Sequence, residues 1–199
     1  MADLEKTGKN LEGRGFRVHR FASGAEAAEF LVQTLHGTSI GIGGSVTIDT
    51  LGVYDRLCES NEVFWHWKNH APETRERAGK AETYLCSANG VSENGEIVNI
   101  DGFGNRVAGT IYGPERVFLV VGRNKIAPDL NGAIDRARNI AAPLNARRLN
   151  RHTPCAVGEP RCHDCRSPEK ICGVMTVFFM PPTSIKEFHV LLVNEDLGY

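Results

Sequence analysis

The sequence predicts an α/β fold in which helices cover a mostly parallel β-sheet. Two observations lead to this prediction. Short apolar segments suited to strands alternate with segments whose apolar residues recur at helical spacing. One strand segment, residues 115–122 (ERVFLVVG), is apolar almost throughout, which is typical of a central strand buried on both faces. With 199 residues, 41% hydrophobic and 24% charged, the chain has the composition of a globular protein, and we expect residues 1–199 to form a single domain.

The first half of the chain contains alternating helix and strand signals. Residues 23–35 predict an amphipathic helix, because Ser23 can cap its first turn and Glu26 completes a capping box. A short strand around Ile40 then runs through glycines into a segment whose apolar residues have helical spacing, namely Ile48, Leu51 and Tyr54. The next elements are a strand at 62–67, a polar helix at 72–81 and a strand at 83–90.

The second half adds a hairpin and a cysteine-rich loop to this pattern. Residues 95–113 predict an antiparallel hairpin insertion, with two extended segments on either side of a Gly-Phe-Gly-Asn turn. A helix begins near Asp129 and is expected to end near Pro143. The last elements are a cysteine-rich insertion at about 152–173 and strands at 175–180 and 187–194.

The overall charge gives no indication of nucleic acid or membrane partners. Lysine and arginine number 23 and aspartate and glutamate 24, so the formal net charge is −1. The first residues, MADLEKTGKNLEGRGF, lack the apolar core of a signal peptide, and no run reaches the roughly 18 apolar residues of a spanning helix. We therefore expect a cytoplasmic protein without a membrane span.

The glycine-rich segment GIGGSVT, residues 41–47, is the first candidate ligand site. It follows a predicted strand, and open α/β sheets bind ligands at the carboxyl ends of their strands. Glycines let the backbone approach a ligand, and hydroxyls and helix N–H groups can bind a phosphate or carboxylate. The segment matches neither the Walker A nor the dinucleotide pattern, so no nucleotide cofactor is evident. The candidate ligand-binding residues are Gly41, Gly43, Gly44, Ser45 and Thr47, and the alternative is a turn without a ligand.

Two further segments contain polar residues that could take part in binding or chemistry. In residues 87–109, the candidate ligand-binding residues are Ser87, Asn89, Asn105 and Arg106, and the candidate catalytic acids, bases or nucleophiles are Glu93, Glu96 and Asp101. Residues 121–126 add the cations Arg123 and Lys125 after a buried strand. For residues 87–109 the alternative is turn formation alone, because Asn-Gly and Asp-Gly are common turn sequences. For residues 121–126 the alternative is a solvated loop.

Four cysteines late in the chain form the pattern C-x6-C-x2-C-x6-C. These residues, Cys155, Cys162, Cys165 and Cys172, could supply four thiolates to an iron–sulfur cluster or to zinc. His152 and His163 could substitute as ligands. The alternatives are a redox-active pair at the central C-x-x-C and free thiols. The other two cysteines, Cys58 and Cys86, are expected to be buried apolar residues.

The sequence resembles the LUD domain family, which is named for lactate utilization and includes lactate utilization protein C. The resemblance covers most of the chain from about residue 16 and rests on five segments: GIGGSVTIDTLGVYDRL, SANGVSENGEIVNIDGFGNRVAG, VFLVVGRNKI, CHDCRSPEKIC and FHVLLVNEDLGY. It implies the NagB/RpiA/CoA-transferase-like fold, a three-layer α/β/α sandwich. It also implies an association with a complex that oxidises L-lactate to pyruvate, with oxidoreductase and iron–sulfur partner subunits.

Three functional hypotheses follow. In the first, the protein supports the oxidation of lactate or a similar 2-hydroxy acid, binds a small carboxylate or phosphate and holds a four-cysteine metal centre. In the second, it is a stand-alone isomerase or acyl/CoA-transfer enzyme for a small phosphorylated or CoA-linked substrate. In the third, it is a non-catalytic assembly subunit. The sequence leaves open whether the chain is catalytic by itself.

Overall fold

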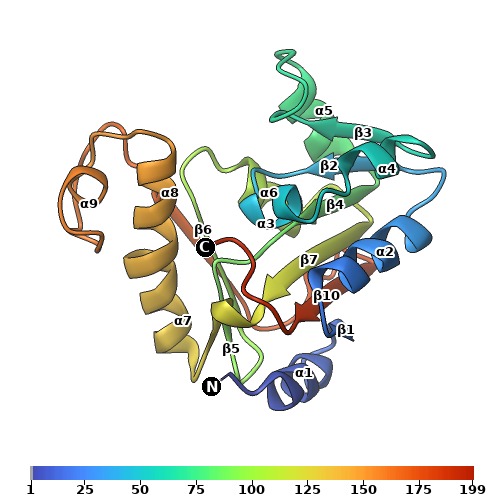
Figure 1. Cartoon of the computed structure of the whole chain (residues 1–199), viewed down its shortest axis with the longest axis horizontal. Coiled ribbons are helices and arrows are strands. Elements are labelled where there is room, and N and C mark those ends of the chain that lie inside the picture. The colour runs from blue at the N-terminus through green and yellow to red at the C-terminus, as the bar shows by residue number, and fades with distance from the viewer. Residues whose placement is uncertain (1) are drawn as a thin grey trace.

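The computed structural model describes residues 2–199 and is built around a parallel sheet. The strand order in this sheet is β1-β10-β7-β4-β2-β3, and all neighbouring strands run parallel (Figure 1). Its strands are β1 (Arg17–Phe21), β2 (Ser39–Ile42), β3 (Glu62–Trp65), β4 (Thr83–Cys86), β7 (Arg116–Gly122) and β10 (Glu187–Val193). The strands predicted around Ile40 and at 62–67, 83–90, 115–122 and 187–194 therefore all contribute to one sheet.

A second, mixed sheet has the order β8-β5-β6-β9. Strand β5 pairs antiparallel with β6 and parallel with β8, and β6 pairs antiparallel with β9. The strands are β5 (Gly90–Ser92), β6 (Ile97–Asp101), β8 (Ile126–Ala127) and β9 (Val174–Phe178). The strand predicted at 175–180 thus belongs to this sheet.

Helices lie on both sides of these sheets (Figure 1). They are α1 (Leu4–Gly13), α2 (Gly24–Thr34), α3 (Val46–Thr50), α4 (Tyr54–Cys58), α5 (Thr74–Lys80), α6 (Asn105–Ile111), α7 (Leu130–Arg136), α8 (Ala142–Arg148) and α9 (Pro154–Val157). Residues 123–125 form a 3₁₀ turn, and residues 137–141 form a π-helical segment between α7 and α8. None of the helices in residues 2–199 has both the length and the apolar character that crossing a bilayer requires.

The two faces of β7 contribute to different parts of the core. Phe118 and Val120 pack with residues of α2, α3 and α4, whereas Val117 and Leu119 belong to a cluster with residues of α1 and the second sheet. A third apolar cluster joins the second sheet to α7. The predicted fold class, an α/β protein with a mostly parallel sheet between helical layers, is confirmed.

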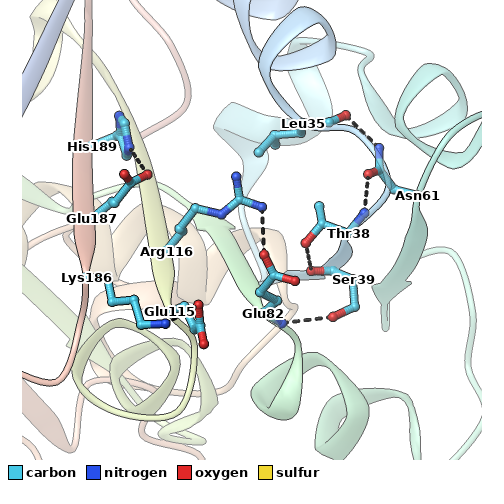
Figure 2. Close-up of polar contacts among 10 residues, drawn as sticks. All are labelled: Leu35, Thr38, Ser39, Asn61, Glu82, Glu115, Arg116, Lys186, Glu187 and His189. Carbon is cyan, nitrogen blue, oxygen red and sulfur yellow. Dashed lines mark hydrogen bonds and ion pairs between the residues drawn. The ribbon is translucent and has the colours of Figure 1, made fainter.

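The amino-terminal ends of β7 and β10 lie among paired charges. Arg116 contacts Glu82 at 3.0 Å and Lys186 contacts Glu115 at 2.7 Å, while the imidazole of His189 lies 3.3 Å from the Glu187 carboxylate (Figure 2). Cations at this edge of the sheet therefore have acidic partners.

The predicted hairpin is wrong in its position. The antiparallel pair is β5 with β6, which lies before the Gly-Phe-Gly-Asn turn, and the residues after that turn form α6 rather than a strand. The carboxylate of Asp101 accepts hydrogen bonds from the N–H groups of Arg106 (3.0 Å) and Val107 (3.3 Å). These contacts satisfy N–H groups in the first turn of a helix and thereby favour helix over strand.

The helix that begins after Asp129 continues beyond Pro143, which corrects the predicted end. Pro143 is the second residue of α8, which follows the π-helical segment at 137–141 without a break. In Figure 1, α7 and α8 run on as a single long helix.

Other parts of the chain also differ from the expectation. The single helix expected to include Ile48 and Tyr54 is divided into α3 and α4 around Gly52, whose φ of +64° is in the left-handed region. Cys58, expected to be buried, is exposed, whereas Cys86 is fully buried as expected. The elements α1 and β1 were not predicted from the sequence.

Candidate functional site

A large pocket of about 730 Å³ is lined by segments that follow the carboxyl ends of β2, β3, β4 and β7. This is the edge of a parallel sheet at which ligands bind in open α/β folds. The loop before α6, the carboxyl end of α8 and part of the cysteine-rich segment complete its wall. The pocket therefore combines segments that are far apart in the sequence.

The glycine-rich loop contributes its second half to this pocket. Gly44, Ser45 and Thr47 line it, and Ser45 caps the short helix α3 by accepting a hydrogen bond from the N–H of Ile48 at 3.3 Å. Gly41 and Gly43 are not among the lining residues: Gly41 packs against the backbone of α5, and Gly43 lies beside the Tyr84 hydroxyl. These two glycines thus provide close packing beneath the loop.

Arg106 lines the pocket and is held by four neutral oxygens. Its guanidinium donates to the side-chain oxygens of Asn89 (2.7 Å) and Asn99 (3.1 Å), and to the carbonyls of Ser87 (3.2 Å) and Ile100 (2.5 Å). Because none of these acceptors carries a charge, the contacts orient the guanidinium without neutralising it. Arg106 can therefore attract an anion into the pocket.

Asp101 also lines the pocket, but its carboxylate has backbone partners. One oxygen accepts from the N–H groups of Gly102 (2.7 Å) and Phe103 (3.2 Å), and the other from those of Arg106 and Val107. Four hydrogen bonds of this kind use most of the accepting capacity of a carboxylate. They give Asp101 a structural role as the cap of α6.

Lys125 lies at the pocket wall with a side chain that is almost fully buried. Its Nζ donates to Thr47 Oγ1 and to Ser87 Oγ, both at 2.8 Å. Burial lowers the pKa of this amine well below its ordinary value, and the nearby guanidinium groups of Arg136 and Arg106 lower it further. Lys125, Thr47 and Ser87 were each predicted to bind a ligand. The structure brings them into direct contact although they come from three different segments.

Positive charge predominates among the residues that line the pocket. Besides the buried amine of Lys125, its basic residues are Arg75, Arg106, Arg148, Arg151 and Lys170, and its acidic side chains are Asp101 and Glu169. Glu169 accepts a hydrogen bond from the N–H of His152 at 2.9 Å and, at 3.3 Å, contacts Nδ1 of the same residue. Two carboxylates do not balance these cations, so an anionic ligand is the complementary partner.

Part of the pocket wall was not predicted from the sequence. His66 and Trp67 follow β3, Arg75 lies in α5, and Arg148 ends α8 with its guanidinium 4.6 Å from the centroid of the Trp67 ring. Within residues 2–199, His66 Nδ1 is a buried nitrogen without a hydrogen-bond partner. The cluster of histidine and tryptophan directly after a predicted strand was a signal that could have identified this wall.

Three other candidate residues lie outside the pocket wall. Glu93 contacts Lys6 at 3.0 Å, Glu96 contacts Arg14, and Arg123 contacts Asp196 at 2.9 Å. The two glutamates hold α1 against the second sheet. Asn89 and Asn105, in contrast, both line the pocket.

The four cysteines of the C-x6-C-x2-C-x6-C pattern surround a second, small cavity of about 20 Å³. All four thiols are free and partly buried. Cys162 is held by two neighbours: its N–H donates to Asn139 Oδ1 at 2.8 Å, and Arg138 Nη2 lies 3.4 Å from its sulfur. Residues 2–199 contain no group of three or more His, Cys, Asp or Glu side chains positioned to hold a metal ion. The fold thus gathers the donors around one cavity, and the metal centre stays a prediction.

Comparison with known proteins relates almost the whole chain to one family. The model of the LUD domain family matches residues 4–193. A DUF162 family protein from Deinococcus radiodurans has a similar structure, with a TM-score of 0.56 and 13% sequence identity over 96% of this chain and 95% of that one. No curated protein matches the sequence. At 13% identity, the structural similarity concerns the fold.

Proposed function

The chain belongs to the LUD domain family, and on that basis we propose that it serves lactate utilization by binding the carboxylate of a 2-hydroxy acid or of the corresponding 2-oxo acid. The binding site is the large pocket at the carboxyl ends of the parallel strands. A four-cysteine metal centre beside it belongs to the same proposal.

The observation that carries the proposal is the excess of unneutralised positive charge at the pocket. Arg106 has only neutral hydrogen-bond partners, and the cations that line the pocket outnumber its two carboxylates, Asp101 and Glu169. At the opposite edge of the sheet, by contrast, Arg116 and Lys186 have acidic partners. A carboxylate ligand would supply the missing negative charge.

The size of the pocket bears on what else it accommodates. A volume of about 730 Å³ lies in the range of pockets that hold drug-sized ligands, and a three-carbon acid occupies only a small part of it. The remaining space suits a second reactant or a segment of a partner subunit. The exposed ring of Phe103 and the partly buried ring of Trp67 give that space a partly apolar wall.

The alternative functions have less support. A stand-alone isomerase or acyl-transfer enzyme would need a carboxylate free to act as base or nucleophile. Glu93 and Glu96 pair with Lys6 and Arg14 beside the second sheet, and Asp101 caps α6. The role of an assembly subunit without a ligand does not explain why so many cations surround one pocket.

Arg75 and Arg77 provide a matched test of anion binding. Both lie in α5, and each guanidinium stacks on a phenylalanine ring, Arg75 on Phe103 at 5.0 Å and Arg77 on Phe64 at 4.2 Å, but only Arg75 lines the pocket. Removing one pocket cation should cost about 1 kcal/mol of Coulomb energy, which is roughly a fivefold weaker Kd. Calorimetric titration with L-lactate and with pyruvate should show this loss in Arg75→Gln and none in Arg77→Gln.

Two results would contradict anion binding at this pocket. One is equal affinity of both variants and the wild type for the acids. The other is equal binding of the uncharged methyl esters, because an ester lacks the negative charge on which the proposal depends.

The metal centre is tested by measuring the metal content of the purified protein rather than its activity. Four thiolates are a suitable donor set for zinc or for an iron–sulfur cluster, which would supply a structural link or a path for electrons respectively. Protein purified without oxygen should contain iron with labile sulfide, or zinc, in a stoichiometric amount that Cys162→Ser reduces. Cys58→Ser is the control, because Cys58 is exposed and lies in α4, away from the four-cysteine cavity. Protein that contains neither metal after anaerobic purification would contradict the metal centre and leave the anion pocket unaffected.

A further inference from the structure

Lys125 has an arrangement of hydrogen bonds that differs from that of a simple anion-binding lysine. Lys125 is only 3% exposed, and its Nζ donates to Thr47 Oγ1 and Ser87 Oγ, both at 2.8 Å. All three residues line the large pocket. The amine is therefore fixed in position at the pocket wall.

The two hydroxyl groups fix the direction of these hydrogen bonds. Ser87 Oγ donates its proton to the carbonyl of Val120 at 2.6 Å, and Thr47 Oγ1 donates to the carbonyl of Leu197 at 3.2 Å. Each hydroxyl must therefore accept from Lys125. A neutral amine has two N–H bonds and one lone pair, so both hydrogens are engaged and the lone pair remains available to a ligand.

The surroundings favour the neutral amine. Burial lowers the pKa of Lys125, and Arg136 and Arg106 add to this effect. The neighbouring Cys86 offers no compensating negative charge, because burial raises the pKa of its thiol to about 12. Across residues 2–199, the hydrogen-bond partners of the Lys125 amine are hydroxyl groups and not carboxylates. A desolvated lysine beside other cations is a recognised form of activated nucleophile.

We propose that Lys125 is a nucleophilic amine that forms an imine with the carbonyl carbon of a 2-oxo acid bound in the large pocket. This inference rests on the proposed function and names the ligand class more closely. An amine does not condense with the hydroxyl of a 2-hydroxy acid, so the reactive ligand is the keto acid. Arg106, at the same pocket, provides positive charge for the carboxylate of that acid.

The reaction needs no oxidant or reductant. The nitrogen lone pair forms a bond to the carbonyl carbon while the π-electron pair of the carbonyl moves to its oxygen, and one proton passes from nitrogen to that oxygen. The hydroxyl group of the resulting carbinolamine takes up the second proton of nitrogen through solvent and leaves as water, while the nitrogen lone pair forms the second bond to carbon. The amine has lost two hydrogens and the acid one oxygen, which balances the imine and one water.

Reductive trapping tests this proposal directly. The whole protein is incubated at pH 7 with pyruvate and cyanoborohydride, and the adduct is located by mass spectrometry of peptides. At that pH, on the order of one exposed lysine amine in a thousand is neutral, so reaction should concentrate on the neutral amine of Lys125. We expect one reduced pyruvate unit on Lys125, at a level at least about tenfold above that of any other lysine.

Two variants and one binding measurement complete the experiment. Lys125→Arg should lose the adduct, whereas Lys170→Arg, which changes another pocket lysine, should retain it. If Lys125→Arg does not fold, the peptide map of the wild-type protein still decides the outcome. Pyruvate that binds in calorimetry without labelling Lys125, or labelling spread evenly over exposed lysines, would overturn the imine and leave the proposed function standing. Absence of both binding and labelling would overturn both.

Discussion

At Gly41 the protein has no room for a side chain. A Cβ atom at this position would lie 1.9 Å from the carbonyl oxygen of Ala78 in α5. The absence of a side chain thus lets α5 approach β2 closely. The sequence indicated that glycine matters here, but it could not distinguish close approach to a ligand from close approach to a helix, because both require the same residue.

A pair of alanine substitutions separates this packing role from the conformational effect that replacing any glycine has on stability. We expect Gly41→Ala to lower the free energy of unfolding by about 1–3 kcal/mol through overpacking. Gly79→Ala, in α5, should raise it by about 0.5–1 kcal/mol, because its Cβ would meet open space and alanine favours a helix. Urea denaturation of both variants measures these changes. Equal free energies of unfolding for Gly41→Ala and the wild type would contradict this packing role, because they would show that α5 can move away from β2 without loss of stability.

Between the neighbouring elements β1 and β10 lies a partly buried histidine pair. His19 Nε2 lies 2.9 Å from His189 Nδ1, and the His189 ring stacks on Phe118 with 4.2 Å between centroids. Burial lowers the pKa of both histidines. The charged groups that face the pair are Arg17 and Glu187. The native state thus favours uncharged imidazoles.

This pair should make the protein less stable in mild acid. Above about pH 6.5, the usual histidine pKa, both rings are neutral in the folded and the unfolded chain and contribute no pH dependence. Below that pH, the unfolded chain binds protons that the folded pair resists, so the free energy of unfolding falls. Thermal unfolding between about pH 7.5 and 5 should show this decrease. The decrease should be smaller in His189→Gln and unchanged in the control His36→Gln, which alters an exposed histidine. An identical pH dependence in His189→Gln and the wild type would contradict the assignment.

An element could be predicted from the sequence when the residues that determine it lie within the element or directly beside it. Strand β7 was predicted from its continuous apolar run, and Ser23 caps the start of α2 as predicted. Helix α6 was missed because its β-branched residues Val107, Thr110 and Ile111 favour a strand locally. Its helical state depends on the Asp101 carboxylate that caps its first turn. That contact is invisible in a hydrophobic pattern.

In the whole molecule, tertiary packing decides which side chains reach the pocket. The prediction of ligand-binding residues in segments that follow strands included Thr47, Ser87 and Lys125, which the fold brings into contact. It did not include Arg148 or Arg75, because the placement of α8 and α5 beside the pocket follows from packing between distant segments. It also did not exclude Glu93 and Glu96, whose partners are in and beside the amino-terminal helix α1. Sequence position indicated the edge of the sheet but not the full set of side chains there.

The extension of the helix past Pro143 links the two candidate sites. Because α8 extends to Arg148, it carries Asn145 and Arg148 to the large pocket and Ala142 and Ala146 to the four-cysteine cavity. One helix therefore contributes to both sites.

The two tryptophans allow the most direct measurement of the central claim, that the large pocket binds the acid anion. Trp67 lines the pocket, whereas Trp65, two residues earlier, is only 1% exposed and is not among the lining residues. In ¹H–¹⁵N spectra recorded during a titration with pyruvate, we predict a saturable shift of the Trp67 indole N–H and of the backbone signals of Ser45 and Ser87. The signals around Glu93 should stay in place. Shifts that cluster around Glu93, or spectra that stay unchanged throughout the titration, would contradict the account.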